Sequence, residues 1–143
     1  MQGKSSDSSS VSFVMPAYNC ADTVVESVES IIQANLEEGD KLIIVDDCST
    51  DNTAQVLSDL KRRYPFIEII SNTQNKGCPA SRNVGIDRAS NPLIFNLDSD
   101  NILVPGSIKQ LKQFMISEKA DMAAFGELYF FQKDKNKVNV SNS

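Results

Sequence analysis

The sequence predicts an α/β fold with a mostly parallel sheet and helices on both faces of that sheet. Short apolar runs alternate along the chain with segments whose apolar residues recur at helical spacing. Each apolar run is continuous, which is typical of parallel strands that are buried on both sides. A chain of 143 residues can bury the core of one such domain and is too short for two.

Five strands are expected, over residues 11–15, 41–47, 66–70, 92–97 and 121–131. Pro16 should end the first strand, because a proline nitrogen cannot donate a hydrogen bond. Gly126 should bend the last one, because glycine in a strand interior weakens the pairing.

Four helices are expected between and after the strands: from Val24 to Leu36, through Leu57 to Tyr64, over residues 80–89, and from Pro105 onwards. Asn19 or Asp22 would cap the first helix. Asp47 or Ser49 are among the side chains able to cap the second. A proline in the first turn is favourable, so Pro105 suits the start of the fourth helix.

Charge and residue types exclude several functions. The formal net charge of −5 supplies no positive surface for nucleic acid, so we expect no such partner. Cys20, Cys48 and Cys78 have neither the spacing of a disulfide framework nor that of a zinc site. Because the chain has no histidine, acid–base chemistry would depend on carboxylates, Lys, Tyr or Cys.

Both ends of the chain are expected to lie outside the domain, which would span residues 11–131. Residues 1–10 are polar without the apolar stretch of a signal peptide, and they are interpreted as a disordered leader. Residues 132–143 are interpreted as a polar tail. Since no apolar run is long enough to cross a bilayer, we expect a cytoplasmic location, which includes peripheral attachment at the inner membrane face.

Polar residues gather where the predicted strands end. In an open parallel sheet, ligands bind outside the C-terminal ends of the strands. Those ends carry Pro16 to Asn19, then Asp46 and Asp47, then Asp98 to Asn101. Because these polar residues stand where such sheets bind ligands, the sequence predicts a ligand site at this edge of the sheet.

Asp98 and Asp100 stand two residues apart after the fourth strand. In an extended segment they project to the same side, where two carboxylates repel unless a cation, a proton or a donor lies between them. Carboxylate oxygens suit Mg²⁺ or Mn²⁺, so a metal site is favoured over turn capping. For Asp46 and Asp47, helix capping and hydrogen bonding to a base or a ribose both stay open.

Lys76 and Arg82 flank Gly77 and the start of the third helix. Cations and free backbone N–H groups at a helix N-terminus favour an anion, although a solvated surface pair fits the charges equally well. Neither a Walker A sequence nor a GxGxxG motif follows the first strand, which argues against classical NTPases and nicotinamide enzymes.

Four segments resemble, in order, those of the family 2 glycosyltransferases: "VSFVMPAYNCADTVVESVESI", "IIVDDCSTDNT", "NKGCPASRNVGIDRAS" and "IFNLDSDN". The resemblance covers about residues 11–131. It implies the GT-A fold, a Rossmann-like sheet, truncated here after about the fifth strand. In that family the site binds a nucleotide-diphospho-sugar, for which we expect uridine, together with Mn²⁺ or Mg²⁺.

The resemblance also implies roles for single residues. The donor-binding residues would be Pro16, Ala17, Tyr18, Asn19, Asp46, Asp47, Gly77, Arg82 and Asp98, and the metal ligand would be Asp100. Within this set, Asp47 would bind the base, Arg82 would border the phosphates and Asp98 would lie by the ribose.

The activity implied is sugar transfer to a hydroxyl of a carbohydrate or lipid-linked acceptor, with inversion, in polysaccharide biosynthesis. The metal would stabilise the leaving nucleoside diphosphate. The family places its catalytic base in a C-terminal half, so this chain is expected to hold the donor half and the base stays unknown. Glu127 is interpreted as a strand residue. Asn101 stands where the family often has an acid, and its carbonyl oxygen can still act as a ligand.

Two other interpretations stay open. A non-catalytic domain would bind a nucleotide sugar or a partner protein, with a homo-oligomer covering an exposed sheet edge. A receiver-like signalling domain fits less well. Its paired acids would follow the first strand, whereas Asp46 and Asp47 follow the second.

Overall fold

The computed structural model describes residues 10–34, 36–117, 127–131 and 138–142. The chain forms two compact units. The first comprises Met1–Val25 with Glu37–Asp100, and the second comprises Glu26–Leu36 with Asn101–Ser143. Within the described ranges, no helix combines the length and the apolar character needed to cross a membrane.

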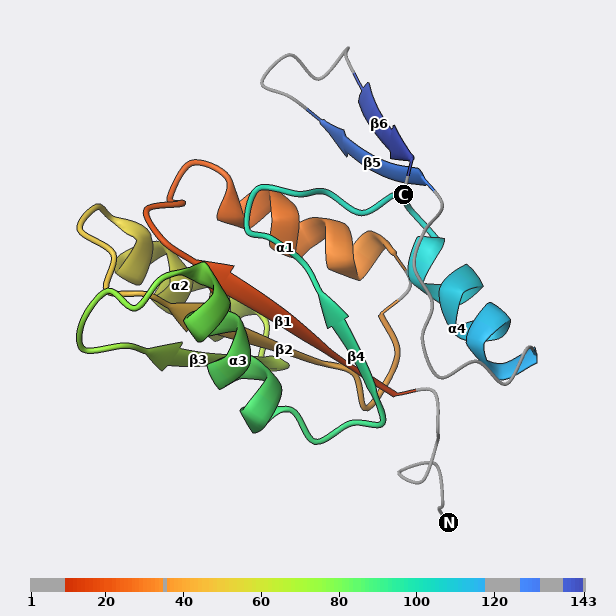
Figure 1. The fold of residues 1–143 in the computed structure, drawn as a ribbon, viewed down its shortest axis with the longest axis horizontal. Helices are drawn as coiled ribbons and strands as arrows, with labels where there is room; N and C mark the ends of the chain where they lie inside the picture. The colour runs from red at the N-terminus through yellow and green to blue at the C-terminus, as the bar shows by residue number, and fades with distance from the viewer. Residues whose placement is uncertain (1–9, 35, 118–126, 132–137, 143) are drawn as a thin grey trace. The chain divides into compact units, whose positions relative to one another are not determined.

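A four-stranded parallel sheet forms the centre of the first unit (Figure 1). Its strands are β1 (Val11–Ala17), β2 (Lys41–Asp46), β3 (Ile67–Ser71) and β4 (Leu93–Asn96), in the order β3-β2-β1-β4. Val14 in β1 lies opposite Ile43 in β2 and Asn96 in β4. The continuous apolar runs are therefore buried parallel strands, and the predicted α/β class is confirmed.

Strand β1 continues beyond Pro16, which was expected to end it. Backbone groups along a strand point alternately to its two neighbours, so Pro16 faces the same neighbour as Val14. The carbonyl of Val14 accepts the N–H of Leu97 at 3.0 Å on the β4 side, and β4 itself has ended at Asn96. The missing N–H of Pro16 thus removes no ladder hydrogen bond, which is why the strand tolerates it.

Helix α3 (Cys78–Arg88) packs closely on β1 and β2. Gly85 is buried at this contact, and a Cβ atom there would lie 2.4 Å from Val14 Cγ1 and 3.3 Å from Val45 Cγ2. The helix begins two residues before the expected start, with Pro79 in its first turn, where proline is favourable. The close approach holds the N-terminal end of α3 beside the ends of the central strands.

Helix α2 (Thr53–Arg63) lies beside β3. Neither Asp47 nor Ser49 caps it. Instead, the carboxylate of Asp51 accepts the backbone N–H of Thr53 at 2.9 Å. Asp47 and Ser49 are thereby available for the site described below.

The second unit contains most of α1 (Val24–Gln33), α4 (Ser107–Ser117), and the antiparallel strands β5 (Glu127–Phe131) and β6 (Val138–Asn142). Ser27 Oγ donates to the carbonyl of Asn101 at 2.6 Å, which ties the segment after β4 to α1. β5 is the second half of the expected fifth strand and pairs with β6 rather than joining the parallel sheet. Gly126 lies outside the described residues. β6 falls within the segment interpreted as a polar tail.

Candidate functional site

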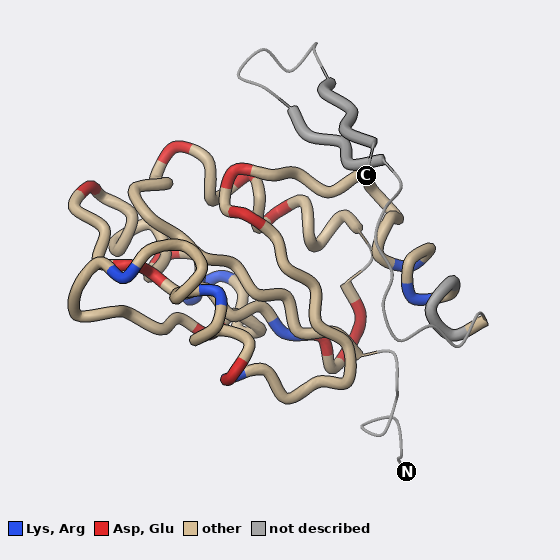
Figure 2. Tube along the Cα trace, in the orientation of Figure 1, with Lys and Arg blue, Asp and Glu red and all other residues tan. Residues whose placement is uncertain are grey.

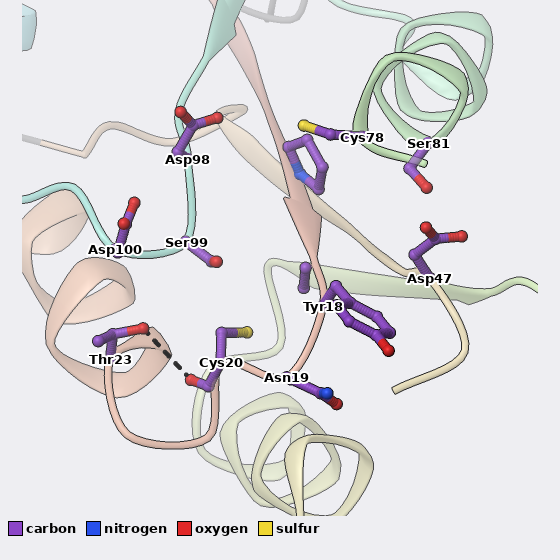
Figure 3. A pocket seen from close by; sticks show the side chains of 12 residues that line it. Tyr18, Asn19, Cys20, Thr23, Asp47, Cys78, Ser81, Asp98, Ser99 and Asp100 are labelled. Carbon is purple, nitrogen blue, oxygen red and sulfur yellow. Dashed lines mark hydrogen bonds between the residues drawn. The ribbon is translucent and has the colours of Figure 1, made fainter. Parts of the chain in front are cut away.

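An open cavity of about 380 Å³ lies at the C-terminal ends of β1, β2 and β4, lined by the end of β1, the loops that follow these three strands and the start of α3. Acidic residues occur in each of the three loops (Figure 2). Figure 3 shows the side chains around the cavity. It is lined by Pro16, Ala17, Tyr18, Asn19, Cys20, Thr23, Asp47, Cys78, Ser81, Asp98, Ser99 and Asp100.

Asn19 joins the loop after β1 to the loop after β2. Its amide oxygen accepts the backbone N–H groups of Thr50 at 2.8 Å and Asp51 at 3.2 Å. The backbone N–H of Asn19 donates to Ser49 Oγ at 3.0 Å. The residue has a φ of 49°, a left-handed conformation that asparagine tolerates better than most residues. Asn19 therefore fixes the cavity wall, and this role takes the place of the helix cap that the sequence predicted.

Asp46 and Asp47 have different partners, although both are buried. Asp46 Oδ1 accepts the N–H and the hydroxyl of Ser49 at 3.1 and 2.6 Å, so it shapes the loop after β2. Asp47 reaches across to the loop before α3, where it accepts the N–H groups of Lys76 at 2.7 Å and Gly77 at 2.8 Å. Of the two carboxylates, Asp47 lines the cavity.

Asn72 and Ser81 complete the surroundings of Asp47. Asn72 Nδ2 donates to Asp47 Oδ1 at 2.9 Å and to Ser81 Oγ at 3.1 Å. Figure 3 shows the Ser81 hydroxyl pointing towards the carboxylate of Asp47. Burial raises the pKa of Asp47, but hydrogen bonds, chiefly those from Lys76, Asn72 and Gly77, outweigh burial and leave the pKa below its usual value. Asp47 is thus an anion held by neutral donors.

Asp98 and Asp100 both line the cavity, and Asp98 forms an ion pair with Arg82. Arg82 Nη2 donates to Asp98 Oδ1 at 3.2 Å and to Cys78 Sγ at 3.3 Å. Asp100 is exposed. In the part of the chain that the structure describes, no group of three or more His, Cys, Asp or Glu could hold a metal by itself. Any ion here would therefore need ligands beyond these two carboxylates.

Cys20 brings a buried thiol to the cavity. Burial raises the pKa of Cys20, against smaller opposite effects of hydrogen bonds with Ser99 and Thr53. The backbone N–H of Cys20 donates to Thr53 Oγ1 at 2.9 Å, which anchors the loop. This thiol is therefore neutral at physiological pH.

Most of the predicted site residues line the cavity: Pro16, Ala17, Tyr18, Asn19, Asp47, Asp98 and Asp100. Gly77 and Arg82 are not in the lining but donate hydrogen bonds to Asp47 and Asp98, which are. Asp46 reaches the lining only indirectly, because it binds Ser49, whose hydroxyl oxygen accepts the backbone N–H of Asn19. The sequence analysis missed Cys20, Thr23, Cys78, Ser81 and Ser99. A single Ser, Thr or Cys is not part of a spaced motif, so the sequence pattern does not mark it as a site residue. Asn72 was missed as well, although its place two residues after a predicted strand was a usable signal.

Known proteins with related sequences are glycosyltransferases. The model of the family "Glycosyl transferase family 2" matches residues 12–143. Poly(ribitol-phosphate) beta-glucosyltransferase of Bacillus spizizenii is 31% identical over 78% of this chain and 18% of its own length. UDP-Glc:alpha-D-GlcNAc-diphosphoundecaprenol beta-1,3-glucosyltransferase WfaP of Escherichia coli is 34% identical over 87% of this chain and 47% of its own length. The chain thus spans less than half of either relative.

Solved structures have the same fold. S. aureus TarS 1–349 in complex with UDP-GlcNAc gives a TM-score of 0.71 at 25% identity, over 77% of this chain and 32% of that one. Mannosyltransferase PcManGT from Pyrobaculum calidifontis, in complex with GDP-Man and Mn²⁺, gives a TM-score of 0.66 at 20% identity, over 71% of this chain and 31% of that one. The fold is therefore GT-A, as the resemblance implied. Because the family model also matches nearly the whole chain, this protein belongs to glycosyl transferase family 2.

Proposed function

We propose that this chain is the donor-binding part of a glycosyltransferase that takes a sugar from a UDP-linked donor. Transfer is to an acceptor hydroxyl, with inversion, and it depends on Mn²⁺ or Mg²⁺. The observation that carries the proposal is the cavity at the strand ends, where Tyr18, Asp47, Asp98 and Asp100 meet. The TarS fragment, which has a similar fold, binds UDP-GlcNAc, and this supports uridine as the base.

Base binding is proposed for the wall that contains Tyr18 and Asp47. An ionised carboxylate is a hydrogen-bond acceptor, and the uracil ring has an N–H group that can donate to it. The Tyr18 side chain is 49% exposed at the cavity and offers an aromatic surface to a flat ligand. Pro16 and Ala17 complete this wall as rigid, apolar neighbours, and Asp46 supports the adjoining loop through Ser49.

Phosphate binding is proposed for the N-terminal end of α3 and for Arg82. The first residue of this helix, Cys78, lines the cavity, and a helix N-terminus favours an anion. The Arg82 guanidinium is held one turn further along, next to Asp98. Gly77 allows the backbone to turn into the helix with a φ of 93°. In this arrangement Asp98 lies by the ribose.

Asp98 and Asp100 fit a metal ion that shares its coordination with the donor. Mg²⁺ and Mn²⁺ are commonly held by one or two carboxylates, with substrate phosphates and water as the other ligands. Asp100 is the proposed ligand, because Asp98 already contacts Arg82. When bound, such an ion stabilises the negative charge on the leaving diphosphate.

The acceptor is proposed to be a carbohydrate or lipid-linked hydroxyl. The names of two relatives specify a poly(ribitol-phosphate) acceptor and a diphosphoundecaprenol-linked acceptor. The second acceptor is a lipid-linked sugar, which supports peripheral attachment at the inner membrane face. We assign no catalytic base among the residues that the structure describes.

Calorimetric titration of UDP, with and without Mn²⁺, tests this proposal. The wild type should bind UDP only with the metal, and Asp100→Ala should lose about tenfold or more in affinity, which corresponds to about 1.4 kcal/mol. Asp87→Ala, which removes an exposed carboxylate near the other end of α3, should bind as the wild type does. Failure of the folded wild type to bind UDP under either condition would contradict the proposal.

A further inference from the structure

A second cavity, of about 400 Å³, lies at the opposite edge of the sheet from the first. Lys41 is the first residue of β2 and Ile67 the first of β3, and both line it, so it lies where these strands begin. Helix α3 joins the two edges, because Cys78 lines the first cavity and Arg88 the second. The polar residues of the second lining are Ser12, Lys41, Lys61, Glu68, Arg88 and Ser90.

This cavity carries an excess of positive charge, in a chain whose formal net charge is −5. Lys41, Lys61 and Arg88 line it together with the carboxylate of Glu68. Arg88 neutralises that carboxylate, since its Nε donates to Glu68 Oε2 at 2.5 Å. The ammonium groups of Lys41 and Lys61 are therefore left without a balancing charge in the lining, and such a cavity attracts an anion.

The ends of the helices explain only part of this charge. Lys61 and Arg88 lie in the last turns of α2 and α3, where cations suit the negative end of the helix dipole. Lys41 begins a strand, so a helix end does not account for it. Lys61 Nζ donates to the carbonyl of Ile67 at 3.0 Å. That bond uses one of the three donors of the ammonium group and leaves the others for a ligand.

A buried hydroxyl group points to a ligand independently of the charges. Ser12 lines the cavity and is only 1% exposed. Because side chains alternate along β1, Ser12 projects to the same face of the sheet as Val14, the face on which α3 packs. Its oxygen accepts the backbone N–H of Asn91 at 3.4 Å. Among the described residues no group accepts the hydroxyl hydrogen of Ser12, so an acceptor inside the cavity would satisfy a buried donor.

We propose that this cavity binds a phosphate group through Ser12, Lys41 and Lys61. The donors come from β1, β2 and α2, and thus from several directions. A phosphate group can meet them because its oxygens are arranged tetrahedrally and it carries nearly two charges, whereas a carboxylate has two oxygens in one plane and one charge. The inference does not depend on the proposed function, since no described residue lines both cavities.

NMR-monitored titration of inorganic phosphate tests the proposal, with the ionic strength held constant because surface cations attract any anion. The backbone signals of Ser12, Lys41 and Lys61 should shift and saturate. Lys41→Met keeps most of the side chain without its charge and should weaken binding about three- to tenfold. Ser12→Ala should weaken it roughly 2- to 10-fold. Arg62→Met removes an exposed cation of α2 that lies outside the lining, and it should bind as the wild type does.

Acetate at the same ionic strength should bind at least about threefold more weakly than phosphate, because it has fewer oxygens and less charge. Acetate binding as tight as phosphate binding would overturn the assignment. Shifts confined to the start of α3 would place the phosphate in the first cavity and would overturn it too. The same holds if Lys41→Met, at an exposed position, binds phosphate as the wild type does, or if Arg62→Met loses as much affinity as Lys41→Met.

The phosphate group could belong to a soluble compound or to a lipid headgroup, and sedimentation with vesicles of phosphatidylcholine and phosphatidic acid distinguishes the two. Co-sedimentation that Lys41→Met and Ser12→Ala weaken would assign the phosphate to a lipid. Saturable binding of inorganic phosphate without co-sedimentation would assign it to a soluble compound. Neither experiment uses UDP, so a negative result here leaves the proposed function standing.

Discussion

Arg82 on α3 donates a hydrogen bond to the carboxylate of Asp98, after β4, at 3.2 Å. Both side chains are partly exposed, so this ion pair adds little to stability. Its effect is on orientation, because it holds the guanidinium beside the cavity. In the proposed complex, a phosphate would compete with Asp98 for Arg82.

Arg82→Ala should weaken UDP binding about tenfold and leave uridine binding unchanged, because uridine has no phosphate for a guanidinium to bind. NMR-monitored titrations with the two ligands, both with Mg²⁺, measure the difference. Arg88→Ala is the matched control, since Arg88 lies on the same helix and pairs with Glu68. Similar losses for uridine and UDP would contradict the phosphate role.

Asp47→Asn should lower the free energy of unfolding at pH 7 by about 1–3 kcal/mol, because a side-chain amide cannot accept all the hydrogen bonds that the carboxylate accepts. The pKa of Asp47 is lower in the folded state than in the unfolded chain. Its ionisation therefore stabilises the fold above the unfolded pKa, and this stabilisation is lost as the pH falls through the folded pKa.

Urea unfolding at a series of pH values checks this prediction. The difference between wild type and Asp47→Asn should be constant above about pH 5 and should shrink below about pH 4. Asp87→Asn, at an exposed site on α3, should stay close to the wild type throughout. A difference that persists unchanged into acid would show that the loss is one of packing rather than of charge.

Gly85→Ala should destabilise the first unit by about 1–3 kcal/mol, since the new Cβ would overlap the side chain of Val14. Chemical denaturation measures the change, and Asn83→Ala at an exposed position of the same helix is the control. Alanine usually stabilises a helix relative to glycine. A gain in stability for Gly85→Ala would therefore mean that α3 does not approach β1 as closely as described.

Cysteine reactivity should report on the cavity. Cys48 and Cys78 are exposed, whereas Cys20 is buried and its pKa is raised by that burial. Iodoacetamide at pH 8 should therefore modify Cys20 about tenfold more slowly than the other two, because the thiolate is the reactive form. Peptide mass spectrometry follows each site separately.

UDP with Mn²⁺ should then protect Cys78, which lines the cavity, and should not protect Cys48, which serves as the internal control. If the nucleotide slowed both cysteines equally, or neither, the proposed position of the donor beside α3 would be wrong.

The order of strands and helices could be predicted because it depends on local patterns. Continuous apolar runs indicate parallel strands, and the chain folds them as such. The ends of the strands, by contrast, depend on the strands that lie beside them in the fold. Pro16 stays within β1 only because β4 stops at Asn96, and this register is not visible in the pattern of β1 itself. Likewise, the strand β6 arises from pairing with β5 in a segment whose composition suggested a tail.

The sequence by itself determined the α/β class, the family, and the clustering of carboxylates at the ends of β2 and β4. Only the tertiary structure decided which of two adjacent carboxylates faces the cavity, because Asp46 and Asp47 differ in partners rather than in type. The tertiary structure also brought Asn72 to Asp47 and to Ser81. These contacts join residues that are far apart in the chain, and hydrogen bonds between separate loops exist only once the parallel sheet has brought its strand ends together.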